Sequence, residues 1–205
     1  MRLIQAAFAI VAILCLAACK ISSDTPLVSA SEIRTPLPAA FNLYTYVPAG
    51  DGSFKRSYSA PFTLQGNAYV WKTSTSTISV SVAPSGKEGE YILLLGSSGT
   101  GQNYGFARYH QGVLALGVTV GAATLKTAQG LIESPSTSAL FAGAQTLPYD
   151  DISLTSRAQL DYLLRLFGQG QLPFDPSDGP AFVAGPGVKA PSKITPNGND
   201  WILTP

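Results

Sequence analysis

Few side chains in this sequence could carry out acid–base or metal chemistry. His110 is the only histidine, so a two-histidine metal site is excluded, and a zinc site would need His110 together with carboxylates. A Ser-His-Asp triad would also need His110 as its base, but the segment "LGSSGTG" lacks the G-x-S-x-G spacing that presents a nucleophilic serine. Because His110 precedes a Gln-Gly turn, we interpret it as a solvated strand end.

The close acidic pairs are Asp150–Asp151 and Glu88/Glu90. The aspartates come shortly before an expected helix and suit its positive end, and no EF-hand spacing is present for calcium. The loop "GSSGTGQNYG", residues 96–105, lacks the lysine of a phosphate-binding P-loop and leads into a tyrosine-bearing segment. We therefore predict no catalytic residues, no cofactor-binding residues and no metal ligands. Paired carboxylates for glycoside hydrolysis could still be brought together from distant strands.

The remaining reactive residues are the two cysteines, Cys15 and Cys19, both in the first tenth of the 205 residues. A disulfide between them would close a very small loop. Positively charged Arg2 precedes an apolar run from Ala6 to Cys19 that is too short to span a membrane as a helix and that is typical of a signal peptide.

The four residues Leu16-Ala17-Ala18-Cys19 resemble the lipobox of bacterial lipoproteins at every position. This resemblance implies that residues 1–18 are removed and that Cys19 carries a diacylglycerol and an N-terminal acyl group such as palmitate. It implies a membrane-anchored envelope lipoprotein and transfers no activity to the globular part, which is similar in kind to uncharacterised envelope lipoproteins. Since Lys20, not aspartate, follows Cys19, the enterobacterial sorting rule indicates the outer membrane, facing the periplasm.

Composition limits the partners of the mature chain. Removal of Arg2 with the signal peptide leaves twelve basic residues against twelve acidic ones, so nothing indicates nucleic-acid binding. The mature chain would contain no disulfide and must rely on a hydrophobic core. We expect the lipid anchor to contact the membrane, with an envelope protein or a glycan as a possible further partner.

The chain divides into four predicted segments. Residues 1–18 form the signal peptide, and residues 19–38 form the lipidated cysteine and a flexible tether, which would have a root-mean-square span of roughly 25 Å. Residues 39–172 form a β-rich globular domain. Residues 173–205, which contain seven of the fifteen prolines, form an extended tail that we expect to form neither a helix nor a central strand.

Within the domain, the pattern predicts about six strands between residues 41 and 120, because apolar and polar residues alternate between short polar turns. The fold class is mainly β (α+β), with an antiparallel sheet or a small barrel and one C-terminal amphipathic helix packed on it. That helix, at about 156–167, begins with the capping box Ser156-x-x-Gln159, and we expect Gly168 to end it. A shorter helix over residues 122–129 is expected to end at Gly130.

Aromatic residues occupy many of the predicted strands (Tyr44, Tyr46, Tyr69, Trp71, Tyr91, Tyr104 and Tyr109). They could form a binding face for a glycan or a protein, or they could be there because aromatic residues favour strands. With no recognisable catalytic group, the sequence favours a non-enzymatic binding or assembly module. The alternatives are a hydrolase of an envelope polymer and a carrier of an apolar ligand inside a barrel.

Overall fold

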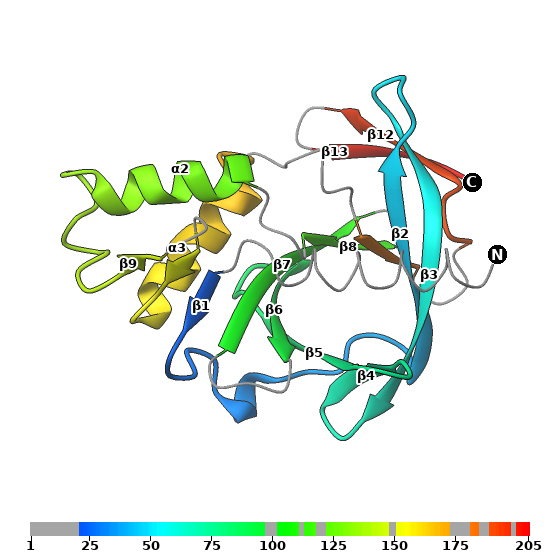
Figure 1. The fold of residues 1–205 in the computed structure, drawn as a ribbon, viewed down its shortest axis with the longest axis horizontal. Helices are drawn as coiled ribbons and strands as arrows, with labels where there is room; N and C mark the ends of the chain where they lie inside the picture. The colour runs from blue at the N-terminus through cyan, green and yellow to red at the C-terminus, as the bar shows by residue number, and fades with distance from the viewer. Residues whose placement is uncertain are drawn as a thin grey trace.

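The computed structural model describes residues 21–96, 102–110, 113–117, 122–147, 151–172, 181–184, 189–197 and 200–205. These residues form a mainly β protein with one large, mostly antiparallel sheet and two α-helices beside it (Figure 1). The strands are β1 (Ile21–Ser23), β2 (Ala40–Pro48), β3 (Phe54–Gln65), β4 (Ala68–Lys72), β5 (Thr77–Pro84), β6 (Glu90–Gly96), β7 (Gln102–His110), β8 (Val113–Gly117), β9 (Gln145–Thr146), β10 (Ile152–Ser153), β11 (Ala181–Ala184), β12 (Lys193–Asn197) and β13 (Asp200–Thr204).

The strand order is β6-β5-β4-β3-β2-β11-β8-β7-β1-β10-β9, and β12 joins β13 to the side of β3. The pairings are antiparallel except for β1 with β10. The sheet as a whole is not closed, because within the described chain β9 pairs only with β10 and β13 only with β12. Between these edges the sheet curves strongly, and β6 pairs with β7 as well as with β5.

Short turns set the register of the neighbouring strands. Gly66, with φ of 61°, occupies the left-handed region in the two-residue turn between β3 and β4, a conformation that glycine adopts without a Cβ penalty. A β-bulge between Thr45 and Tyr46 interrupts the pairing of β2 with β3, and such bulges increase the local bend of a strand. Between residues 41 and 120, where the sequence predicts about six strands, the structure has seven, β2 to β8.

The two α-helices are α2 (Ala122–Glu133) and α3 (Arg157–Gly168). Ser156 is the N-cap of α3 and forms a capping box with Gln159. One predicted helix end is wrong, because α2 continues through Gly130 to Glu133. Helix α3 ends at Gly168, and Gly170, with φ of 69°, is the left-handed residue that follows it. Neither helix has the length and hydropathy to cross a bilayer, within the part of the chain that is described.

Two apolar clusters lie on opposite faces of the curved sheet. The outer cluster joins the outward side chains of β5, β6 and β7 to both helices and includes Ile92, Phe106, Leu125 and Leu163. The helices lie outside the curve of the sheet in Figure 1. The inner cluster lies on the concave side and is built from β2 to β7 alone, together with Leu37.

Residues 21–38 correct the prediction of a flexible tether. Ile21 is fully buried in β1, where it pairs with Tyr104 of β7 and Ile152 of β10. Val28 is also buried, and Arg34 forms a β-bridge with Val82. The apolar residues of this segment are enough to pack it onto the sheet, so the described part of the predicted tether belongs to the domain.

The described part of the proline-rich tail contributes three strands, β11, β12 and β13. Strand β11 lies between β2 and β8 and has a partner on each side, so the expectation of no central strand in residues 173–205 is wrong. The reason is local, because Ala181–Ala184 contains no proline and can donate to both neighbours. The hairpin β12–β13 packs on β3, where Ile194, which is fully buried, lies opposite Phe54.

Candidate functional site

The residues that the sequence analysis considers for chemistry are not gathered at one place. Cys15 and Cys19 lie outside the described residues, as does Asp150, while His110 ends β7. No group of three or more His, Cys, Asp or Glu side chains that could hold a metal ion exists among the described residues. The candidate site is therefore identified from the curvature of the sheet and from its apolar surface.

The buried carboxylate, Glu90, has a structural role. Its side chain is 6% exposed, and its Oε1 lies 2.8 Å from Lys87 Nζ and 3.5 Å from a guanidinium nitrogen of Arg108. Arg108 in turn donates to the carbonyl oxygen of Gly168 at 2.6 Å, at the C-terminal end of α3. A cation at this end of a helix interacts favourably with the helix dipole, so Lys87, Glu90 and Arg108 fasten the C-terminal end of α3 to β6 and β7.

Three further carboxylates, Glu32, Asp51 and Asp161, form ion pairs at the surface. Arg157 of α3 donates to Glu32 and Asp161, at 2.6 and 2.7 Å. A hydrogen bond from the Ser29 backbone and the contact with Arg157 lower the pKa of Glu32. Lys193 pairs with Asp51 at 2.8 Å, and hydrogen bonds from Lys193 and Ser53 hold the pKa of Asp51 well below its usual range.

The concave side of the sheet presents one continuous set of apolar side chains, which we call the inner face. Its members follow from the strand registers, because directly opposed residues point to the same face and side chains alternate along each strand. No member of this set carries a charge; the same registers also place Gly105 and the amide Asn103, opposite Leu95, on this face, and Lys55, opposite Val47, beyond the bulge. The set comprises Phe41, Leu43 and Thr45 of β2, Tyr58, Ala60, Phe62 and Leu64 of β3, Tyr69 and Trp71 of β4, Ile78, Val80 and Val82 of β5, Tyr91, Leu93 and Leu95 of β6, and Ala107 and Tyr109 of β7.

Five aromatic rings form a connected series along the inner face. Phe41 stacks on Phe62 with 5.5 Å between ring centroids and meets Tyr69 edge-on at 5.2 Å. Trp71 lies 6.2 Å from Phe62 and 6.0 Å from Tyr58. The series runs from Tyr69, which is fully buried, to Tyr58, which is 41% exposed. Such pairs stabilise their own arrangement by roughly 0.5–1.5 kcal/mol each, so the series forms a firm apolar wall.

The buried end of the aromatic wall, where Tyr69 contacts Leu37, is closed, and we call it the floor. The hydroxyl of Tyr69 donates to the Leu37 carbonyl and accepts from the Leu37 amide, both at 2.9 Å, and burial raises the pKa of Tyr69. A small pocket of about 10 Å³ lies above the floor, lined only by apolar surface from Leu37, Phe41, Leu43, Phe62, Tyr69, Val80, Val82 and Leu93. That volume is at the lower limit for a single water, and an apolar lining does not retain one.

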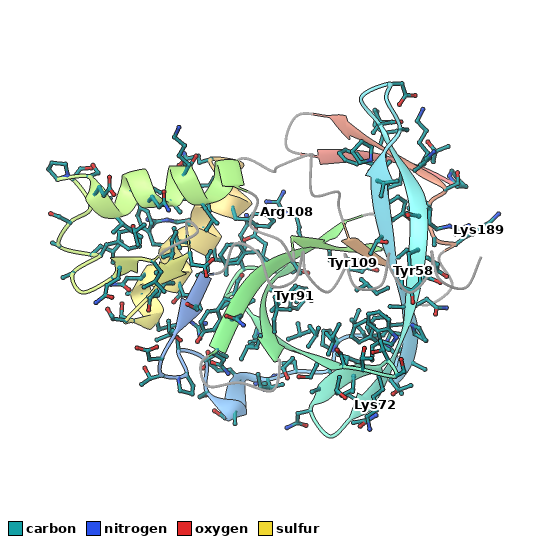
Figure 2. All side chains as sticks on the ribbon, viewed as in Figure 1. Tyr58, Lys72, Tyr91, Arg108, Tyr109 and Lys189 are labelled. Atoms are coloured by element: carbon teal, nitrogen blue, oxygen red, sulfur yellow. The ribbon has the colours of Figure 1, made fainter. Side chains whose placement is uncertain are left out.

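The other end of the inner face is open. Tyr109 is 51% exposed and Tyr58 is 41% exposed, whereas large apolar side chains of the floor such as Phe62 and Leu93 are buried. Figure 2 shows Tyr58 on one side of the curved sheet, Tyr91 on the other and Tyr109 between them, with Lys72 and Lys189 at its outside. We call Tyr58, Tyr91 and Tyr109 the rim.

The seven aromatic residues that the sequence analysis considers for a binding face do not all lie on one face. Tyr69, Trp71, Tyr91 and Tyr109 belong to the inner face. The other three lie elsewhere. The ring of Tyr44 forms a cation–π contact with Arg56, the hydroxyl of Tyr46 donates a hydrogen bond to the Pro191 carbonyl, and the hydroxyl of Tyr104 is hydrogen-bonded to the Ser23 hydroxyl. The sequence analysis missed Tyr58, because β3 is longer than its apolar centre at Phe62–Leu64 indicates.

No protein-family model, curated protein or solved structure matches the chain.

Proposed function

We propose that this protein is a non-enzymatic binding module of the cell envelope and that its inner face binds an apolar ligand or an apolar part of a partner. One observation carries the proposal: a charge-free, largely aromatic wall leads from a buried floor to exposed tyrosines. Apolar surface that stays partly accessible on a concave face is typical of a binding site. Seven apolar side chains of the inner face are only partly buried: Phe41, Leu43, Leu64, Ile78, Val80, Tyr91 and Leu95.

The scaffold that we propose for this function is a small barrel of eight strands, β2 to β8 and β11. Its support is that each of these strands has a pairing partner on both sides, since β6 pairs with β5 and β7 while β11 bridges β2 and β8. In such a barrel one face of every strand points inward. Helix α3 would then be an amphipathic helix on the outside, with Leu160, Leu163, Leu164 and Leu166 buried.

The location that we propose is the outer membrane, through lipid attached to Cys19. This rests on the lipobox resemblance of Leu16–Cys19. Ile21 is part of the core, and two residues span at most about 7 Å. An acyl anchor on Cys19 would therefore hold the domain close to the bilayer surface rather than at the end of a long tether.

The binding function can be tested with a neutral fluorophore, N-phenyl-1-naphthylamine, which fluoresces strongly only in apolar surroundings. We expect the full chain to raise its emission saturably. Val80, which is partly buried, lines the pocket opposite Tyr69, so Val80→Trp should fill the site and reduce the emission at least fivefold. Thr63→Trp is the matched control, because Thr63 is exposed and alternates with the inner-face residues of β3.

Two results of this experiment would refute the proposal. One is that the wild-type chain causes no saturable emission. The other is that Val80→Trp, shown by circular dichroism to be folded, binds the fluorophore as well as the wild-type chain does.

A further inference from the structure

We infer that the ligand of the inner face is a neutral amphiphile, a molecule with one apolar chain and an uncharged head group that forms hydrogen bonds. This inference rests on the proposed function and names the ligand class for the same site. It predicts that the apolar chain of the ligand lies along the aromatic wall toward the floor and that its head group contacts the rim tyrosines.

The apolar half of the inference follows from the floor. The pocket at the floor exposes no polar surface, and the hydroxyl of Tyr69 is occupied by the backbone of Leu37 through both of its hydrogen bonds. A polar group placed there would lose its water without gaining a partner. The pocket of about 10 Å³ has room for no more than about one water-sized group, so the apolar part of the ligand would lie along the wall above the floor.

One row of directly opposed residues joins the two sides of the rim, from Tyr58 of β3 to Tyr91 of β6. Directly opposed residues run in register from β3 through β2, β11, β8 and β7 to β6. The side chains of Thr45 and Ala107 in this row are small, whereas tyrosines stand at its two ends. The row is Tyr58, Thr45, Ala181, Leu116, Ala107 and Tyr91.

The polar half of the inference follows from the rim hydroxyls. None of the hydroxyls of Tyr58, Tyr91 and Tyr109 forms a hydrogen bond with another described residue. A phenol both donates and accepts, so the rim can satisfy an alcohol, ester or amide head group. Between the floor and the rim, the described residues of the inner face offer no cation to a carboxylate or phosphate and no anion to an amine, and burying an unpaired charge there would be costly. Lys55 lies on this face only beyond Tyr58 and the bulge, outside that interval.

Trp71 provides the test, because it lies in the wall and the chain has only one other tryptophan, Trp201. The probes are a monoacylglycerol, the matching fatty acid and the matching alkane, each brominated on the chain so that it quenches a tryptophan that it touches. The full chain is kept soluble in an amphipathic polymer, because detergent monomers would compete. Trp201→Phe leaves Trp71 as the only tryptophan, and Trp71→Phe is the matched control that leaves Trp201.

We expect the monoacylglycerol to quench Trp201→Phe at a concentration at least tenfold lower than the fatty acid or the alkane requires, and to leave Trp71→Phe unquenched. Replacing all three rim tyrosines by phenylalanine should abolish this preference. Tyr44→Phe, outside the inner face, should retain it.

The outcomes separate this inference from the proposed function. Equal quenching by all three probes would refute the preference for a neutral head group but would still support an apolar binding site. Stronger quenching by the fatty acid would also overturn it. Quenching of Trp71 by none of the three would overturn both the inference and the proposed site.

Discussion

At the scale of single residues, the polar side chains of this protein mainly fasten segments to the sheet, and the inner face is left without charge. Tyr46 is an example: its ring is 2% exposed, and its hydroxyl donates to the Pro191 carbonyl at 2.6 Å. Glu90 acts similarly at the end of α3. Each of these contacts predicts a specific loss of stability.

Tyr46 predicts a loss of stability at high pH. Burial raises the pKa of Tyr46 to about 12, whereas an unfolded tyrosine has a pKa of about 10. The neutral phenol therefore stabilises the fold fully below pH 10, and this contribution is lost as the pH rises toward 12, at up to about 1.4 kcal/mol per pH unit. Urea unfolding at pH 9 to 11.5 should show a steeper fall for wild type than for Tyr46→Phe, which loses about 1 kcal/mol at neutral pH. Equal slopes would contradict the assignment.

Glu90 predicts a difference between two neighbouring substitutions. Glu90→Gln removes the charge that faces Lys87 and Arg108 and should lower the free energy of unfolding by about 1–3 kcal/mol, because Arg108 stays partly buried. Glu88→Gln is the control, since Glu88 is exposed and has no ion pair among the described residues. Chemical denaturation of both variants measures the difference, and equal stability would show that Glu90 does not fasten α3.

At the scale of elements, the two helical glycines predict opposite effects. A Cβ at Gly130 of α2 would meet nothing within 4 Å, so Gly130→Ala should stabilise the protein by about 0.5–1 kcal/mol. A Cβ at Gly168 of α3 would lie 2.5 Å from Glu90 Oε1, so Gly168→Ala should destabilise it by about 1–3 kcal/mol. Thermal unfolding of the two variants distinguishes them, and a shift of the same sign in both would contradict the packing of α3.

Strand β1 predicts that the N-terminal segment is part of the core. Ile21 is fully buried between β7 and β10, so Ile21→Ala should cost about 2–4 kcal/mol. Ile202→Ala, at a side chain that is 53% exposed, should cost under about 0.5 kcal/mol. If the two substitutions had equal effects on the urea midpoint, β1 would not be an integral strand.

The strands and α3 could be predicted from local patterns, whereas their long-range partners could not. Alternation along Thr77–Val82 and the capping box at Ser156 are local features, and the structure has β5 and α3 there. Strands β1 and β11 are only three and four residues long, so their pattern is too short to recognise, and they form because the neighbouring strands offer free backbone groups. The inner face depends on those distant pairings, so local patterns could not show which of the aromatic residues share a face.

At the scale of the whole molecule, the lipid anchor remains a prediction about Cys19. Cys19→Ser should move the protein from the detergent phase to the aqueous phase or stall it as a precursor, while Cys15→Ser should leave its partitioning unchanged. Detergent phase separation of the two variants measures this. If the Cys19→Ser variant still partitioned as a lipoprotein, the anchor would lie elsewhere. Density-gradient fractionation tests which membrane carries the protein. Recovery wholly in the inner-membrane fraction would refute only the proposal of the outer membrane.

The central claim is that the inner face is occupied by an apolar ligand in the protein's own envelope. The most direct measurement is native mass spectrometry of the full chain isolated from that envelope, with Val80→Trp and Thr63→Trp prepared in parallel. We predict a small neutral molecule bound near one per chain in the wild-type and Thr63→Trp proteins, and its loss from Val80→Trp. A wild-type protein that carries no ligand, or a Val80→Trp protein that carries as much of it, would contradict the claim.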